Sequence, residues 1–167
     1  MASPCPAEAP AAGLVSGLVP VRADDVPDVE AFLRDADLTL AGLDRADVHL
    51  WVARDASGRV AASAGFELSA DGEHALVRST AVRQDRRGRG EGLAVAEFAV
   101  LRARDAGARH AWLFSRRSGP FWQRLGFARA TTEELAGVLA DATQVRLFRR
   151  TGQLEREVAW HRDLDRP

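Results

Sequence analysis

Arg87-Gly88-Arg89-Gly90-Glu91-Gly92 is the stretch of this chain that says most about its fold. It lies between an apolar, strand-like run that ends at Val82 and a helical run that starts at Leu93. Glycines let a backbone approach a ligand closely, and a helix N-terminus presents unpaired N–H groups and the positive end of the helix dipole. The two arginines add positive charge at the same place. A strand, a glycine-rich turn and a helix start in this order predict a site that binds phosphate groups.

The composition is that of a globular domain with its own hydrophobic core. The chain has 167 residues, 46% of them hydrophobic, and its net charge of -1 gives no general preference for nucleic acid or an anionic membrane. Its single cysteine, Cys5, excludes a disulfide framework and a cysteine-based zinc site, and no histidines stand at metal-ligand spacing, so no metal is expected. No apolar run approaches the roughly 20 residues that span a bilayer. The N-terminus is a poor signal peptide, so we expect a cytoplasmic protein.

The pattern of apolar residues predicts an α/β (α+β) fold with a mixed, mostly antiparallel central sheet flanked by helices in a single domain. Strands are expected at 18–22, 48–53, 59–68, 74–82, 110–115 and 143–149, and helices at 26–35, 93–106, 120–125 and 131–139. Residues 38–43 are expected to form a loop or a short helix. Around the domain at 18–150 we expect a disordered tail at 1–17 and a C-terminal extension, either a tail or an extra helix, at 151–167.

A second motif lies downstream of the glycine-rich turn, in the segment Phe121-Trp122-Gln123-Arg124-Leu125-Gly126-Phe127. Together the two motifs resemble the GCN5-related N-acetyltransferase (GNAT) family. Its acetyl-CoA loop reads Gln/Arg-x-x-Gly-x-Gly/Ala, and Arg87, Gly90 and Gly92 occupy the fixed positions. Its second marker is an aromatic residue followed by x-x-Leu-Gly-Phe. The resemblance covers about residues 18–149 and, within the family, is greatest to small amino-acid and arsenic-resistance-type N-acetyltransferases, whose substrate-side loop looks like residues 38–43.

The resemblance implies that the glycine-rich turn and the strand before it bind acetyl-CoA as a co-substrate. The strand backbone would hold the pantetheine arm as an added strand would, and the turn and helix start would hold the pyrophosphate. One residue departs from the family, because Glu91 stands where an apolar or basic residue is usual. A carboxylate there is unfavourable beside a pyrophosphate unless it points away. The residues implied are Thr80, Ala81, Val82, Arg87, Gly88, Arg89, Gly90, Glu91, Gly92 and Leu93.

The family works by direct attack of an amine on the thioester in a ternary complex. The resemblance implies that the Val82 N–H stabilises the oxyanion that forms. Glu67, at the end of the strand before the loop strand, is the first choice as the base that deprotonates the amine, through water; a surface carboxylate is the alternative reading. His74 is the second choice, because it titrates near neutral pH.

The proton for the leaving thiolate usually comes from a tyrosine in this family, and this chain contains none. The matching position holds Trp122, which cannot act as an acid. Ser115 or Ser118 would substitute, or bulk water would suffice because a thiolate is a good leaving group.

For the acceptor, Arg78 is the predicted contact, with Phe121 and Trp122 as walls of the pocket. Arg78 lies on the loop strand, where a buried arginine needs an anion, and a substrate carboxylate would fit bidentately. An internal salt bridge to Glu67 or Asp71 is the alternative that the sequence leaves open.

The predicted activity is acetyl transfer from acetyl-CoA to the amine of a small amino acid or amino-acid-like metabolite. A first alternative is a GNAT-fold acyl- or aminoacyl-transferase that uses a carrier-protein or tRNA donor in natural-product biosynthesis. A second alternative is a non-catalytic CoA-binding module. A homodimer is possible, because many relatives of this kind dimerise; no membrane partner is expected, and nucleic acid enters only as the tRNA of the first alternative.

Overall fold

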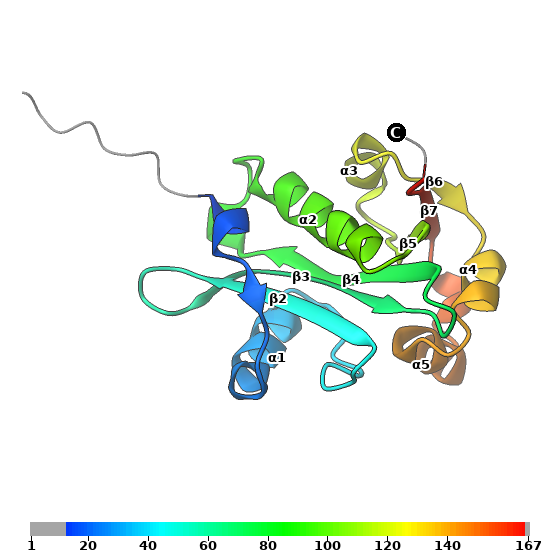
Figure 1. Cartoon of the computed structure of the whole chain (residues 1–167), viewed down its shortest axis with the longest axis horizontal. Helices are drawn as coiled ribbons and strands as arrows, with labels where there is room; N and C mark the ends of the chain where they lie inside the picture. Colours follow the sequence, from blue (N-terminus) through cyan, green and yellow to red (C-terminus); the bar gives the residue numbers. More distant parts are fainter. Residues whose placement is uncertain (1–12, 166–167) are drawn as a thin grey trace, which may run out of the picture.

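Residues 13–165, which a computed structural model describes, form one seven-stranded sheet with helices on both faces (Figure 1). The strand order is β1-β2-β3-β4-β5-β7-β6; β4 and β5 are parallel and every other pair is antiparallel. The predicted mixed, mostly antiparallel sheet is therefore confirmed. None of the described helices is long and apolar enough to cross a membrane. The strands are β1 (Val19–Pro20), β2 (Val48–Arg54), β3 (Val60–Leu68), β4 (His74–Val82), β5 (His110–Phe114), β6 (Ala128–Ala130) and β7 (Ala159–Asp163).

The helices divide between the two faces of the sheet. In Figure 1, α2 lies above β3 and β4, whereas α1 lies beneath β2. Alanines on the buried side of α2 let its backbone approach the sheet closely, and Val29 and Leu33 of α1 pack against β2. The α-helices are α1 (Val26–Asp35), α2 (Glu91–Asp105), α3 (Gly119–Arg124), α4 (Thr132–Val138) and α5 (Thr143–Thr151). Short 3-10 turns are η1 (Leu14–Gly17), η2 (Ala23–Asp25), η3 (Gln84–Arg86) and η4 (Leu154–Arg156).

The two parallel strands at the centre of the sheet separate before β4 ends. The ladder between β4 and β5 covers only residues 74–76 and 110–112. Beyond it, β4 continues to Val82 while paired to β3 alone, so one edge of its backbone faces an opening instead of a strand. That edge offers N–H and C=O groups to a ligand, since each residue of an extended strand points them alternately to its two sides.

A bulge in β4 marks the beginning of this free edge. Two residues of β4, Ser79 and Thr80, stand opposite the single residue Ala64 of β3. Ser79 has a φ of 54°, in a region that residues with a Cβ rarely occupy, and its carbonyl accepts a 2.6 Å hydrogen bond from Ser63 Oγ. The bulge lies beyond the residues of β4 that pair with β5, and it changes the pairing of the end of β4 with β3.

The segment 143–149, which the sequence predicts as a strand, is helix α5 instead. Val145 and Phe148 are its buried residues, and a spacing of three is helical. The apparent alternation came from Leu147, which is only half-buried. The N-terminus of α5 is capped by a residue of β3 that lies 76 positions earlier, so the local sequence carries no sign of it.

The two ends of the described chain also differ from expectation. The C-terminal extension contains β7, which lies between β5 and β6 and completes the sheet, so it is neither a tail nor an extra helix. At the other end, residues 14–17 form η1 and Leu14 is buried in the core. The rest of the expected N-terminal tail, residues 1–12 with Cys5, lies outside the described residues.

Candidate active site

A cavity of about 590 Å³ lies where β4, the glycine-rich turn and α3 meet. Ligand pockets are commonly of this size. Most of the residues predicted for acetyl-CoA line it, together with part of α3 and the end of α1. The lining consists of Ala36, Leu38, Thr80, Ala81, Val82, Arg87, Gly88, Gly90, Gly92, Leu93, Val95, Ser118, Phe121, Trp122 and Arg124.

The glycine-rich turn feeds directly into the N-terminus of α2. Gly88 and Gly90 have φ values of 82° and 78°, a conformation in which a side chain would be strained. Gly90 is the N-cap and makes no side-chain cap bond, so the first N–H groups of α2 remain available to a ligand. Fifteen residues of helix stand behind them, with the positive end of the dipole at the cavity.

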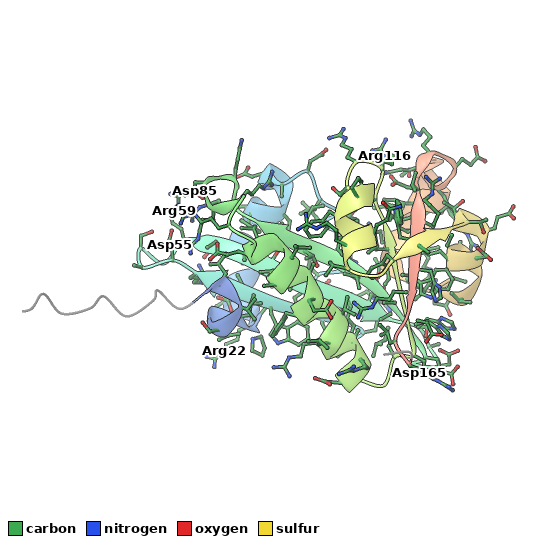
Figure 2. The ribbon with its side chains drawn as sticks, turned by 90° about the horizontal axis from the view of Figure 1, so that it is seen from above. Arg22, Asp55, Arg59, Asp85, Arg116 and Asp165 are labelled. Atoms are coloured by element: carbon green, nitrogen blue, oxygen red, sulfur yellow. The ribbon has the colours of Figure 1, made fainter. Side chains whose placement is uncertain are left out.

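A network of ion pairs fixes the turn where β4 ends. Arg83 Nη1 lies 2.8 Å from Asp55 of the β2–β3 hairpin, and Arg83 Nε lies 2.7 Å from Asp85 of η3. Figure 2 shows Asp55 and Asp85 at the same end of the molecule. The hydrogen bonds from Ser57 and Arg83 lower the pKa of Asp55 well below its usual range, which keeps the carboxylate charged. The turn therefore starts from an anchored position.

The N–H group of Val82 points to the open side of β4. Arg83 N donates to Ala61 O at 2.9 Å, so this pair is hydrogen-bonded across β3 and β4. Such pairs alternate in an antiparallel ladder, so the next pair, Val82 with Ala62, is not hydrogen-bonded. Both backbone groups of Val82 thus face away from β3. Arg87 Nε donates to the Val82 carbonyl at 3.0 Å, and the N–H has the orientation that the predicted oxyanion donor requires.

Glu91 and Arg89 do not line the cavity, unlike the other residues predicted to bind the cofactor. Arg86 Nη2 lies 3.2 Å from Glu91 Oε1, and the Glu91 side chain is only 16% exposed. The one carboxylate of the turn is therefore paired and directed away from the place where phosphate would bind.

Helix α3 supplies the aromatic wall. The ring of Trp122 packs edge-on against Phe121 and Phe127, with centroids 5.0 and 5.5 Å away. Phe121 and Trp122 line the cavity, as predicted for the pocket wall. Of the two serines considered as acids, Ser118 lines the cavity, whereas Ser115 Oγ accepts a hydrogen bond from Ser118 N and supports the start of α3.

Glu67 and Arg78 lie outside the cavity and bind each other. Arg78 Nη1 donates to Glu67 Oε2 at 3.1 Å, and the two side chains are 2% and 0% exposed. Burial lowers the pKa of Arg78, and the Glu67 carboxylate opposes that change. The internal salt bridge, which the sequence left open as the alternative to carboxylate binding, is the arrangement found. A role for Glu67 as base, or for Arg78 as substrate contact, would require this pair to open.

His74, the second candidate for the base, is at the far end of β4. Its Nδ1 accepts a hydrogen bond from Trp112 Nε1 at 3.1 Å, and its ring stacks on His110. Desolvation and the neighbouring His110 lower the pKa of His74. It does not line the cavity.

Three residues line the cavity without having been predicted, Ala36, Val95 and Arg124, and Leu38 lines it as well. Leu38 is the first residue of the loop 38–43, which the family resemblance placed on the substrate side. Arg124 belongs to the second motif, but the pattern alone does not distinguish it from a solvated helix residue. Ala36 and Val95 face the cavity only because α1 ends and α2 begins beside β4.

Comparison with known proteins assigns the fold to a family. Residues 19–127 match the acetyltransferase (GNAT) family. The chain belongs to the GNAT family. This family consists of acyltransferases that use acetyl-CoA as co-substrate, and the resemblance read from the two motifs is confirmed at that level. No curated protein matches the chain.

Solved structures of low sequence identity share this GNAT fold. N-acetylglutamate synthase from Neisseria gonorrhoeae, solved with coenzyme A and N-acetyl-glutamate, aligns with a TM-score of 0.70 at 18% identity over 88% of this chain. The chain spans about a third of that enzyme, because the match covers 34% of it. A Mycobacterium tuberculosis protein, Rv2747, solved with CoA and a second ligand, aligns at 0.65 and 20% identity over 88% of this chain and 98% of its own. A GNAT acetyltransferase from Staphylococcus aureus aligns at 0.64 and 10% identity, with 88% and 98% covered.

The cavity suits the chemistry of acetyl-CoA. A diphosphate needs N–H donors and positive charge, which the N-terminus of α2 and Arg87 offer. A pantetheine arm carries amide groups, which pair with the free edge of a strand, and β4 offers that edge beyond its ladder with β5. The glycines of the turn leave room for the approach, because no atom lies within 4 Å of a Cβ built at Gly88 or Gly90.

Proposed function

We propose that this GNAT protein transfers the acetyl group of acetyl-CoA to the primary amine of a small amino acid or an amino-acid-like metabolite. One observation carries the proposal: a single cavity joins the N-terminus of α2 to the free edge of β4. Phosphate and pantetheine groups would then lie in one continuous site, and the amine would attack from its apolar end beside Leu38 and Trp122.

Acetyl-CoA, when bound, supplies a thioester carbonyl that is open to attack. The residues of this chain do the rest by orientation and hydrogen bonding. Backbone groups of residues 80–82 align the donor, the turn from Arg87 to Leu93 holds its phosphates, and the Val82 N–H donates to the oxygen on which negative charge develops. Arg89 and Glu91 contribute charge from the outer side of the turn only.

Two protons must move in the reaction. The ammonium of the acceptor loses one, which water would take because no carboxylate or histidine of the described residues lines the cavity, and the leaving thiolate gains one. In the described chain, Thr80 and Ser118 are the hydroxyl residues that line it. The Thr80 hydroxyl donates to the Arg78 carbonyl at 3.1 Å, so Ser118, with Ser115 behind it, is the hydroxyl that would orient a proton or a water molecule toward the leaving sulfur.

Trp122 shapes the wall and excludes water. Glu67 and Arg78 enter this proposal as supports of the site, because their buried pair keeps them from the reacting atoms.

Two observations support an amino acid as acceptor. Leu38, Phe121 and Trp122 give the cavity an apolar wall, and Arg124 offers a guanidinium to the same cavity, which suits a small acceptor with a carboxylate. The GNAT-fold enzyme from Neisseria was solved with an N-acetylated amino acid.

The direct test is an acceptor screen. The full chain is incubated with acetyl-CoA and each of the twenty common L-amino acids, and release of the CoA thiol is followed with a thiol reagent. Calorimetry with CoA alone runs in parallel. Thiol release that depends on an amino acid supports the proposal. Tight CoA binding without release for any amine would favour a CoA-binding module, and absence of CoA binding would refute the donor.

A further inference from the structure

The buried pair of Glu67 and Arg78 binds more than its own two strands. Glu67 Oε1 accepts hydrogen bonds from Thr143 N at 2.5 Å and from Thr143 Oγ1 at 2.8 Å. Glu67 therefore caps the N-terminus of α5, where its negative charge faces the positive end of the helix dipole. No side-chain nitrogen or oxygen buried among the described residues lacks a partner. Glu67 and Arg78 are the only charged residues that are buried in the described part of the chain.

Arg78 extends the cluster to the loop 38–43. Its Nη2 donates to Ala41 O at 2.6 Å and to Thr39 O at 3.4 Å. A second tie runs from Gln144 Nε2 to Thr39 Oγ1 at 3.2 Å. Loop carbonyls have no strand or helix to pair with, so a buried guanidinium that donates hydrogen bonds to two of them holds the loop in one place.

The same loop packs directly on α5. A Cβ built at Gly42 would lie 2.7 Å from Thr143 Oγ1 and 2.8 Å from its Cγ2, closer than atoms can approach. Gly42 therefore lets the loop backbone lie against the residue that Glu67 caps. Four segments, β3, β4, the loop and α5, meet at this one point.

The cluster is joined to the cavity on both sides. Leu38, at the start of the loop, lines the cavity. Arg78 immediately precedes the bulge at Ser79 and Thr80, and its Nε lies 3.4 Å from Ser79 Oγ. One guanidinium is thus in contact with the loop on one side of the acceptor end and with the bulge of β4 on the other.

We propose that Glu67, Arg78 and Thr143 are positioning residues that hold the loop 38–43 as a fixed wall of the acceptor end of the cavity. The proposal rests on the proposed function, since it assigns the wall to the amine acceptor. The charges are kept inside the protein because a guanidinium and a carboxylate, each with several partners, fix the relative positions of four segments more sharply than apolar side chains do. No hydrogen bond or ion pair among the described residues joins the cluster to the glycine-rich turn or to α2, which form the phosphate end of the cavity.

Gly42→Ala tests the wall without removing any charge. The new methyl group meets Thr143 and pushes the loop away. Gly72→Ala is the matched control, because Gly72 has a φ of 75° against 72° for Gly42, and nothing lies within 4 Å of its Cβ. Both variants place a side chain at nearly the same positive φ, so the variants differ chiefly in the contact with Thr143. We expect KM for the most active amino acid of the screen to rise roughly tenfold in Gly42→Ala, with KM for acetyl-CoA within about twofold, and neither to change in Gly72→Ala.

Hydrogen exchange gives a readout that does not depend on turnover. Amides of residues 38–44 should exchange faster in Gly42→Ala than in Gly72→Ala, while calorimetry shows the same CoA affinity for both. Unchanged exchange in the loop would overturn this proposal. A failure to acetylate any amine would count against the proposed function alone, because the exchange measurement does not need turnover. Faster exchange with an unchanged acceptor KM would overturn the role of the loop as a wall.

A pair of variants at Thr143 separates its hydroxyl from its bulk. Thr143→Ser keeps the hydroxyl that donates to Glu67, and Thr143→Val keeps the branched shape but loses it. We expect the acceptor KM to rise severalfold in Thr143→Val and to stay at the parent value in Thr143→Ser. The reverse order would show that packing on Gly42, rather than the cluster with Glu67, sets the wall.

Discussion

Gly92 is the position at which a single charge tests how the cavity binds acetyl-CoA. It lies in the first turn of α2, and a Cβ built on it has one neighbour, Phe121 Cε2 at 3.7 Å, which is ordinary contact. Its φ is not positive, unlike that of Gly90 at 78°, so a side chain adds no backbone strain there. Gly92→Asp therefore places a carboxylate at the cavity in a helix that tolerates it. An aspartate in the first turn stabilises a helix by roughly 0.3–1 kcal/mol.

The expected loss of CoA affinity follows from Coulomb repulsion. At an effective dielectric constant of about 20, a carboxylate about 5 Å from one phosphate charge is repelled by roughly 3 kcal/mol. Screening at an open cavity reduces the cost to about 2 kcal/mol, which corresponds to a roughly thirtyfold rise in Kd. Gly92→Asn, which has the same shape without the charge, should raise Kd only severalfold.

Titration calorimetry of CoA into the parent and the variants measures these values. Ala94→Asp is the positional control, because Ala94 is exposed in the same helix and does not line the cavity. The difference between the aspartate and asparagine variants should shrink from low to high salt, and pantetheine, which has no phosphate, should not distinguish them. Equal CoA affinity in Gly92→Asp and Gly92→Asn would refute the placement of the diphosphate at the start of α2.

Three further outcomes follow from named contacts. His74 accepts its hydrogen bond from Trp112 only when neutral, and burial lowers its pKa. Below about pH 6.5 the unfolded chain therefore binds a proton at His74 that the folded chain does not bind, which destabilises the fold. The midpoint of urea unfolding should fall between pH 7.5 and pH 5, and it should fall less in His74→Phe. Thr131 and Glu134 form a capping box at the start of α4, so Thr131→Ala should cost about 1 kcal/mol in chemical unfolding, whereas no loss would show that packing alone holds α4. Trp122→Tyr adds a phenol where the family usually has one. A rise of about tenfold in kcat for thiol release would show that the lack of a general acid limits the rate of the parent protein, while an unchanged kcat would show that water suffices as the acid.

The sequence predicts those parts of the fold that depend on neighbours along the chain. The three strands β2, β3 and β4 and helix α4 were each predicted within a residue or two, because the spacing of apolar residues acts over a few positions. The glycine-rich turn behaved in the same way. The phosphate site that we propose there needs only positive φ values and a helix start, and both are local.

Contacts between distant segments account for what could not be predicted. Helix α5 is capped by Glu67 from a distant strand, and β7 pairs with β5 and β6, which lie far from it along the chain. A sequence pattern shows that Glu67 and Arg78 carry charge, but not that they neutralise each other inside the core. That choice depends on the register of β3 and β4, in which Gly65 rather than Glu67 stands opposite Arg78 and the two charged side chains meet diagonally across the sheet.

Glu91 shows how one departure from a family pattern can be absorbed by its neighbour. A carboxylate at the first position of α2 is favourable for the helix but competes with any anion at the same place. Arg86, at the end of η3, binds that carboxylate and keeps it out of the cavity, while Arg87 donates to the Val82 carbonyl and lines the cavity itself. Two adjacent arginines therefore have different positions: Arg86 pairs with the carboxylate at the start of the helix, and the guanidinium of Arg87 lines the cavity. The turn retains its positive character because the compensation is local, and Glu91 stabilises α2 without weakening the site that α2 creates.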